Sequence, residues 1–157
     1  MSDAIAYFIT WTIYGTHLPG SEKWWNKKGY GLLPPRPRLE QWCRDRLKFP
    51  IQTLQSFERR CLQKTIEKHC EVRNWRLWAV NPRTTHVHVV LTARLVLPET
   101  TRDQFKAYCT RCLRNESDRW TGRDIWTPGG YCSLLDDEED LANAIEYVVN
   151  GQDYDGW

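Results

Sequence analysis

Residues 85–92 read Thr-His-Val-His-Val-Val-Leu-Thr, a run of mostly β-branched and apolar residues that predicts a strand. Successive side chains of a strand point to opposite faces, so His86 and His88 should lie side by side on one face. The other face carries Val87, Val89 and Leu91. We therefore expect a strand whose apolar face packs on the core while its two histidines form a pair.

Alternating strands and helices surround this run. We predict three further strands, at residues 5–14, 74–81 and 131–135, and helices at residues 39–48, 53–71, 101–115 and 136–150. A capping box, Thr101-x-x-Gln104, should open the third helix, and Gly151 should end the last one. The order predicts an α+β protein with a ferredoxin-like βαββαβ antiparallel sheet, helices on one face, and an additional C-terminal helix.

Between the first strand and the first helix, residues 16–38 hold three glycines and four prolines, and we expect a long loop there. Helical spacing predicts a buried face on each of the two longer helices. For the helix at 53–71 this face consists of Leu54, Phe57, Cys61, Ile66 and Cys70, and for the helix at 101–115 of Phe105, Tyr108, Cys109 and Cys112.

Length and composition indicate one globular domain over residues 1–157. No apolar run approaches eighteen residues, so we expect no membrane span. The first residues lack the basic and apolar pattern of a secretory signal. We therefore expect a cytoplasmic protein whose six cysteines stay reduced and serve as packing residues.

The net charge of +2 conceals an uneven distribution. Residues 1–135 carry all 22 Lys and Arg against 12 acids, whereas residues 136–157 carry eight acids and no Lys or Arg. A basic body suits a phosphate-rich partner, although a solvated basic surface has the same composition. Nine tryptophans and seven tyrosines favour the first interpretation, because unpaired bases stack on such rings. Residues 16–38 are our candidate for part of this surface.

Two imidazoles that project from one strand face are suitable metal ligands. A bare His-x-His can equally be a hydrogen-bonded, inert pair, so the triplet alone does not decide between a metal site and a structural role. The cysteine-free set argues against structural zinc.

The whole pattern resembles the single-tyrosine HUH transposases, including the REP-associated tyrosine transposases. HUH denotes His, a bulky hydrophobic residue and His on a central strand, and residues 86–88 fit that triplet. Three other segments resemble one branch of the family, and they are Trp11-x-x-Tyr14-Gly15-Thr16-His17-Leu18-Pro19-Gly20, Trp126-Thr127-Pro128-Gly129-Gly130 and Ile145-Glu146-Tyr147-Val148-Val149-Asn150-Gly151-Gln152. The resemblance runs from about residue 5 to residue 152, and the order of the segments makes it specific.

This resemblance implies a DNA transposase that cleaves and rejoins single-stranded or hairpin DNA through a 5′-phosphotyrosine. Tyr147 would be the nucleophile, and His86 and His88 would hold Mg²⁺ or Mn²⁺. The family's polar third ligand lies four residues after the tyrosine, but that position is glycine here, which leaves Gln152, with Asn150 as the alternative. The resemblance also implies a homodimer, whose last helix can supply the tyrosine to the partner's histidines.

Tyr147 also stands out from its position on the predicted helix. Leu141, Ala144, Ile145 and Val148 form the apolar stripe of that helix, and Tyr147 lies on its flank. A flank tyrosine can present its hydroxyl while its ring is held, or it can simply cover the edge of the stripe. Two other functions stay open: a catalytically retired protein that binds nucleic-acid hairpins, and a metal-dependent nuclease that activates water.

Several other signals have structural interpretations that we prefer. We expect Cys109 and Cys112 to pack on a helix face, because no second cysteine pair or histidine accompanies them. The acidic run at 136–140 should cap a helix. Tyr108 should be a core residue, and Tyr154 lies too near the end of the chain to be well positioned.

Overall fold

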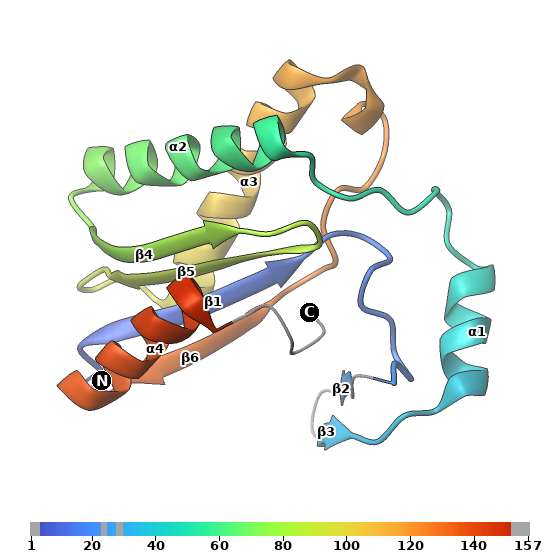
Figure 1. Ribbon diagram of the computed structural model, residues 1–157, viewed down its shortest axis with the longest axis horizontal. Helices are drawn as coiled ribbons and strands as arrows, with labels where there is room; N and C mark the ends of the chain where they lie inside the picture. Colours follow the sequence, from blue (N-terminus) through green and yellow to red (C-terminus); the bar gives the residue numbers. More distant parts are fainter. Residues whose placement is uncertain (1–3, 23–24, 28–29, 152–157) are drawn as a thin grey trace.

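The computed structural model of the chain describes residues 4–22, 25–27 and 30–151. Its main sheet has four antiparallel strands in the order β4-β5-β1-β6 (Figure 1). Their bounds are β1 Ala6–Thr12, β4 Arg76–Pro82, β5 His86–Thr92 and β6 Tyr131–Leu135. Each lies within a few residues of its predicted position, and β5, with its two histidines, is a central strand. The predicted ferredoxin-like α+β class is confirmed.

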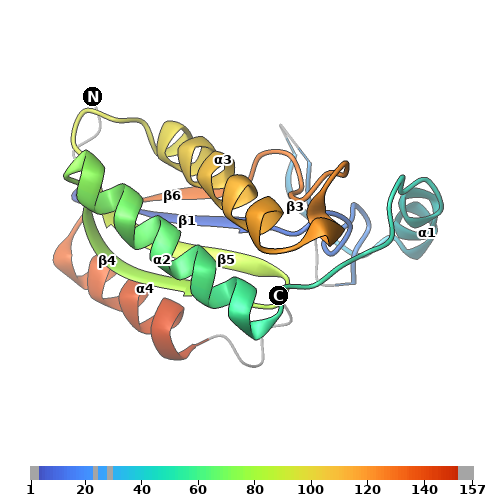
Figure 2. The same ribbon diagram turned by 90° about the horizontal axis from the view of Figure 1, so that it is seen from above.

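Helices cover both faces of this sheet (Figure 2). α2 (Ser56–Arg73) and α3 (Pro98–Glu116) lie on one face, and the C-terminal α4 (Glu138–Asn150) lies on the other. Val87, Val89 and Leu91 are fully buried beneath α2 and α3, as the alternation in β5 predicts. The histidine face of β5 is therefore the face that α4 covers.

Residues 16–38, which we expected to form a long loop, contain a small hairpin of β2 (Trp25–Lys27) and β3 (Gly31–Leu33). The helix predicted at residues 39–48 is present as α1 (Pro37–Asp45). α1 projects away from the main sheet and has no buried residue (Figures 1 and 2). Near each end of α1, a glycine from the preceding segment packs closely against the chain. A Cβ at Gly20 would collide with the Arg36 carbonyl oxygen, and one at Gly15 would lie 3.0 Å from the Ile51 side chain.

Two expectations about the longer helices are wrong. α3 begins at Pro98, which suits the first turn because it has no N–H to leave unpaired. Thr101 lies inside the helix and donates to the Pro98 carbonyl oxygen at 2.7 Å, so it caps nothing. Phe57 and Tyr108, predicted as core, are 41% and 38% exposed. Each lies at the edge of its helix's buried stripe, where a large ring covers the core without entering it.

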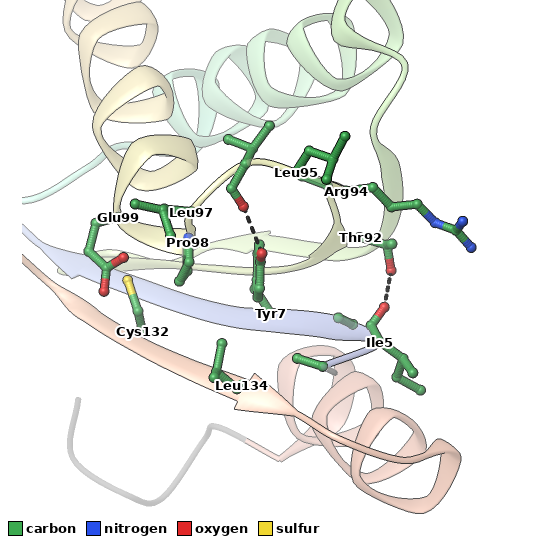
Figure 3. A pocket seen from close by; sticks show the side chains of 14 residues that line it. Ile5, Tyr7, Thr92, Arg94, Leu95, Leu97, Pro98, Glu99, Cys132 and Leu134 are labelled. Carbon is green, nitrogen blue, oxygen red and sulfur yellow. Dashed lines mark hydrogen bonds between the residues drawn. The ribbon is translucent and has the colours of Figure 1, made fainter. Parts of the chain in front are cut away.

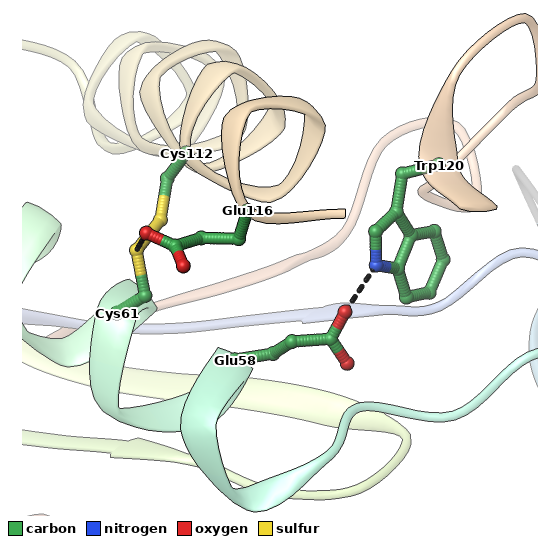
Figure 4. Close-up of a disulfide and its surroundings, with 5 residues drawn as sticks. All are labelled: Glu58, Cys61, Cys112, Glu116 and Trp120. Atoms are coloured by element: carbon green, nitrogen blue, oxygen red, sulfur yellow. Dashed lines mark hydrogen bonds between the residues drawn. A yellow bond between two sulfur atoms is a disulfide. The ribbon is translucent and has the colours of Figure 1, made fainter. Parts of the chain in front are cut away.

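The expectation that all six cysteines stay reduced is also wrong. Cys61 on α2 and Cys112 on α3 form a disulfide (Figure 4). The two helices pack side by side on one sheet face, which brings the Cα atoms to 6.8 Å although the residues are 51 apart in sequence. Cys43, Cys70, Cys109 and Cys132 remain free. The disulfide therefore covalently joins the two helices that form this layer.

We predict that the denatured, unreduced protein titrates four thiols per chain, and that reduction raises this number to six. Reduction should lower the free energy of unfolding by about 2–4 kcal/mol, because the crosslink restricts the unfolded chain. Urea unfolding with and without reductant measures this change. A Cys43→Ala variant is the control and should keep the sensitivity to reductant. Six thiols in the unreduced protein would contradict the crosslink.

Candidate active site

The two histidines of β5 lie together beneath α4. Their ring centroids are 4.5 Å apart, and the exposed fractions of His86 and His88 are only 3% and 0%. The strand alternation predicted this shared direction. It did not predict the burial, which comes from α4 lying over this face.

Each histidine ring is hydrogen-bonded through its Nδ1 atom to a threonine hydroxyl. Thr10 Oγ1 lies 2.6 Å from His88 Nδ1, and Thr85 Oγ1 lies 3.1 Å from His86 Nδ1. Thr10 reaches its partner because β1 and β5 pair with Thr10 directly opposite His88. With Nδ1 engaged, Nε2 is the nitrogen that each ring can present to a ligand. Such hydrogen bonds orient an imidazole and select its tautomer.

The surroundings of His88 keep its ring neutral. Burial, and to a smaller extent the electrostatic interactions with His86 and Arg83, lowers the pKa of His88 from 6.5 to about 3. A buried imidazolium would be poorly solvated and repelled by its neighbours. At neutral pH His88 is therefore the uncharged imidazole, which is the form that binds metal ions.

Tyr147 reaches the same place from α4. Its ring centroid lies 5.5 Å from that of His88 and 5.9 Å from that of Phe8 on β1. Phe8 in turn stacks on His88 at 5.4 Å, so the three rings form one aromatic group. The amide of Asn81 on β4 donates to the Val148 carbonyl oxygen at 2.8 Å, which attaches the end of α4 to the sheet. The predicted nucleophile and a predicted metal ligand are therefore neighbours within one chain.

This arrangement can be compared with known proteins. No protein-family model matches the sequence, and no curated protein matches it. The structure is similar to that of a REP-associated tyrosine transposase bound to a REP hairpin, with a TM-score of 0.53 and 14% identity. This chain has the fold of that transposase. The alignment covers 94% of this chain but only 66% of the transposase.

A second similar structure comes from Deinococcus radiodurans R1, and its assignment as a transposase is provisional. Its TM-score is 0.48 at 13% identity, and the alignment covers 94% of this chain and 91% of that one. The likeness to the REP-associated transposase confirms the fold expected from the resemblance, while the roles of individual residues rest on the site itself.

The transposase fold does not decide the third metal ligand. Gln152 lies outside the described residues. Asn150 is exposed, and its amide nitrogen donates to Glu146 Oε1 at 3.1 Å. Within the part of the chain that the structure describes, no three His, Cys, Asp or Glu side chains cluster as metal ligands. Two imidazoles with no carboxylate or thiolate beside them among the described residues fit an ion whose remaining ligands are amide, water or phosphate oxygens.

Three residues of the site escaped the sequence reasoning, and they are Phe8, Thr10 and Asn81. Phe8 and Thr10 alternate on one face of β1, and a polar threonine within an apolar strand was the available signal. Asn81 is the polar residue opposite His88 on β4. None of them could be connected to the histidines before the strand order and register were known.

Two of the signals that we assigned to structure, the cysteine pair and the acidic run, have structural roles. Cys109 is fully buried in the core, and Cys112 forms the disulfide. The Asp137 side chain accepts from the Asp140 N–H at 2.8 Å and caps α4, as predicted. Tyr154 lies outside the described residues. Across the described ranges, no helix combines the length and apolar character that a membrane span needs.

A hollow of about 980 Å³ opens at the other end of the sheet (Figure 3). It is lined mostly by apolar side chains such as Ile5, Leu95 and Leu97, and the Tyr7 hydroxyl donates to the Val96 carbonyl oxygen at its wall. Among the described residues, His86, His88, Tyr147, Thr10 and Thr85 do not line it. The candidate site is therefore separate from this hollow.

We predict that His88 of the metal-free protein stays neutral in an NMR titration down to about pH 4, because its pKa is about 3. In the unfolded chain the same proton binds with a pKa near 6.5. Protonation of His88 in the unfolded chain therefore lowers the free energy of unfolding as the pH falls from 6.5 towards 3. A His88→Gln variant assigns the resonance. A titration midpoint near 6.5 would contradict the buried, neutral ring.

Proposed function

We propose that this chain is a transposase that cleaves and rejoins single-stranded DNA bearing a hairpin, and that Tyr147 forms a 5′-phosphotyrosine. The observation that supports it best is the contact of Tyr147 with His88, 5.5 Å between ring centroids, in a chain with a transposase fold. A DNA hairpin partner is in keeping with the REP hairpin that the similar transposase binds.

The proposed reaction exchanges one phosphate ester bond for another at Tyr147. The Tyr147 oxygen attacks the scissile phosphorus and loses its proton, a new P–O bond forms, and the bond to the 3′ oxygen breaks to give a 3′-hydroxyl. A later attack by a 3′-hydroxyl on the phosphotyrosine reverses the exchange, so rejoining needs no nucleotide energy source. A phenol with a pKa near 10 is only about 0.1% ionised at pH 7, and ionising it costs roughly 4 kcal/mol.

We propose that His86 and His88 hold a magnesium or manganese ion, with Gln152 or Asn150 as a further ligand. Such an ion polarises the scissile phosphate and orients the attack. Thr10 and Thr85 contribute by holding the two rings through Nδ1. Removal of such a partner typically weakens metal binding about 10–100-fold.

We also propose a homodimer, because moving a DNA segment requires two ends to be held together. Each site would be built within one chain, since Tyr147 contacts His88 of its own chain. This differs from the exchanged helix that the resemblance allowed.

The DNA surface that we propose includes the α1 arm, which we define as residues 30–48. Its exposed basic residues are Arg36, Arg38, Arg44, Arg46 and Lys48, against two acids. Trp42 is 54% exposed with the Arg46 guanidinium 3.7 Å above its ring. A projecting helix with this composition suits phosphate contacts and base stacking. It overlaps the segment that the sequence indicated, residues 16–38.

We predict that the protein, incubated with single-stranded hairpin DNA and Mg²⁺ or Mn²⁺, forms a covalent adduct that survives denaturation. Tyr147→Phe should form none, because the variant lacks the attacking oxygen but keeps the ring that packs on Phe8. His86→Ala/His88→Ala should lose metal-dependent cleavage by a factor of about 10³ or more and still fold. Gel electrophoresis of labelled DNA measures both outcomes.

Tyr108→Phe is the matched control, because Tyr108 lies on the outer side of α3 against His69. A mixture of Tyr147→Phe and His86→Ala/His88→Ala chains tests the single-chain site, and confirmed mixed dimers should stay inactive. Cleavage without an adduct would favour a nuclease that activates water. Tight hairpin binding without any cleavage would favour the retired binding protein.

We predict that affinity for hairpin DNA falls steeply with salt. Arg38→Gln/Lys48→Gln in the α1 arm should reduce the slope of log K against log salt by about 0.7–0.9 for each phosphate that the variant no longer neutralises. Lys64→Gln/Lys68→Gln on α2 is the charge-matched control and should leave the slope nearly unchanged. Fluorescence anisotropy over a range of about 50 to 200 mM salt gives both slopes. A flat dependence, or equal slopes in the two variants, would exclude the arm as the DNA surface.

A further inference from the structure

A shallow hollow of about 400 Å³ lies beside the C-terminal end of α3. Its lining residues come from α3, from the segment after it and from the chain just beyond the α1 arm, and they are Phe49, Arg114, Thr121, Gly122, Arg123 and Asp124. The proposed chemistry at Tyr147 uses none of them. α1 and the segment after α3 lie beyond the same end of the main sheet (Figures 1 and 2).

Arg123 is the buried residue of this lining, with only 8% of its surface exposed. It donates from Nε and Nη1 to the carbonyl oxygens of Asp124 and Pro50 at 3.1 and 2.6 Å. Its Nη2 is buried without a hydrogen-bond partner among the described residues. Burial lowers the pKa of Arg123, because a guanidinium is poorly solvated there. An anion placed beside it would offset this cost.

Arg114 lies at the surface of the same hollow. Its Nε and Nη2 donate to the carbonyl oxygens of Trp120 and Arg123 at 3.4 and 3.2 Å, whereas its Nη1 makes no hydrogen bond to any residue that the structure describes. Arg119, the third arginine of this segment, pairs with the buried Glu58 carboxylate. Within the described ranges, neither Arg114 nor Arg123 forms such an ion pair. The hollow therefore carries two uncompensated positive charges.

The main chain at Gly122 leaves the hollow open to a ligand. Gly122 has a φ of +71°, which glycine adopts without strain, and a Cβ there would meet nothing within 4 Å. The Thr121 side chain is exposed, and its hydroxyl has no hydrogen-bond partner in the described part of the chain. A ligand that enters the hollow can therefore approach the backbone closely and meet a free hydroxyl and a free guanidinium nitrogen.

The hollow adjoins the α1 arm. Phe49 follows Lys48, the last residue of the arm, and the Lys48 N–H donates to the Tyr14 hydroxyl at 2.7 Å. The rings of Tyr14 and Phe49 pack edge to face with centroids 5.8 Å apart. Tyr14 lies just past the end of β1, whose Thr12 pairs with His86. The hollow is therefore close both to the surface proposed for DNA and to the histidine end of the sheet.

The charge of the hollow favours a phosphate over a base. Arg114 and Arg123 outnumber the one acidic residue of the lining, Asp124, and a guanidinium matches the oxygens of a phosphate. The Phe49 ring, which could otherwise stack on a base, is half-buried with the Arg123 guanidinium 5.4 Å from its centroid. Asp124 is exposed, so it repels a phosphate but would attract the amino group of a base.

We propose that this hollow, which we call the phosphate pocket, binds one backbone phosphate of the DNA. Arg114 and the Thr121 hydroxyl donate to its oxygens, and Arg123 stabilises its charge from the buried side. The phosphate pocket thereby extends the DNA surface from the α1 arm towards the sheet. The proposal rests on the proposed function for its ligand, but its test does not require cleavage.

The test measures binding without divalent metal by fluorescence anisotropy, using hairpin DNAs that each carry one neutral methylphosphonate in place of a phosphate. For the wild-type protein, this change at the phosphate in the pocket should weaken binding roughly tenfold. Arg114→Gln should weaken binding of unmodified DNA by a similar factor and remove the penalty at that position alone. Arg111→Gln, the matched control, lies on the same helix over the Tyr108 ring and should keep every penalty.

Asp124→Asn tests the ligand from the opposite direction. Loss of the repelling charge should strengthen binding of unmodified DNA about two- to fivefold, and this gain should vanish with the methylphosphonate at the position sensitive to Arg114. Glu67→Gln on α2 is the control and should show no gain that depends on position. Weaker binding by Asp124→Asn would favour a base and overturn the phosphate pocket. Thermal unfolding of each variant confirms that it is folded.

The outcomes separate the pocket from the chemistry. If every methylphosphonate penalty survives Arg114→Gln, the phosphate pocket is overturned even if wild-type protein forms the covalent adduct. A penalty removed at one position, without any adduct, would support the pocket and contradict the strand-transfer function. A failure to bind hairpin DNA at all would overturn both.

Discussion

The antiparallel pairing of β1 with β5 is the constraint on which the candidate site depends. This register places Thr10 opposite His88 and Thr12 opposite His86, and it aligns Phe8 on the same face. A shift by one residue would turn every side chain of a strand to the other face. It would move the histidines into the core beneath α2 and α3. The buried valines of β5 resist such a shift because they fill that core.

Burial and charge act together on the histidine face. α4 removes water from His86 and His88, and the resulting desolvation keeps His88 neutral. The same helix carries Glu138, Glu139, Asp140 and Glu146 on or near its surface. Phosphates are repelled from such a surface and attracted to the basic α1 arm. A DNA strand would therefore approach Tyr147 beside α4.

Most of the fold could be predicted from local patterns, because each strand and helix has its own period of apolar residues. β5, β6 and α4 lie close to their expected bounds for this reason. The errors have physical causes. The start of α3 was set by the conformational preference of Pro98. The loop expected at residues 16–38 contains the β2–β3 hairpin, whose strands of three residues each are too short for an apolar period to reveal. The disulfide between Cys61 and Cys112 was missed because sequence separation says nothing about helix neighbours.

The sequence by itself determined the strand that carries His86 and His88, their shared direction, and a flank position for Tyr147, because these follow from periods of two and 3.6 residues. Tertiary structure decided which face α4 covers, and thereby brought Tyr147 to 5.5 Å from His88. It also decided the contacts of Thr10, Asn81 and Phe8, and the meeting of residues 17–19 with 127–130. These depend on strand order and register, which long-range packing selects and local patterns do not record.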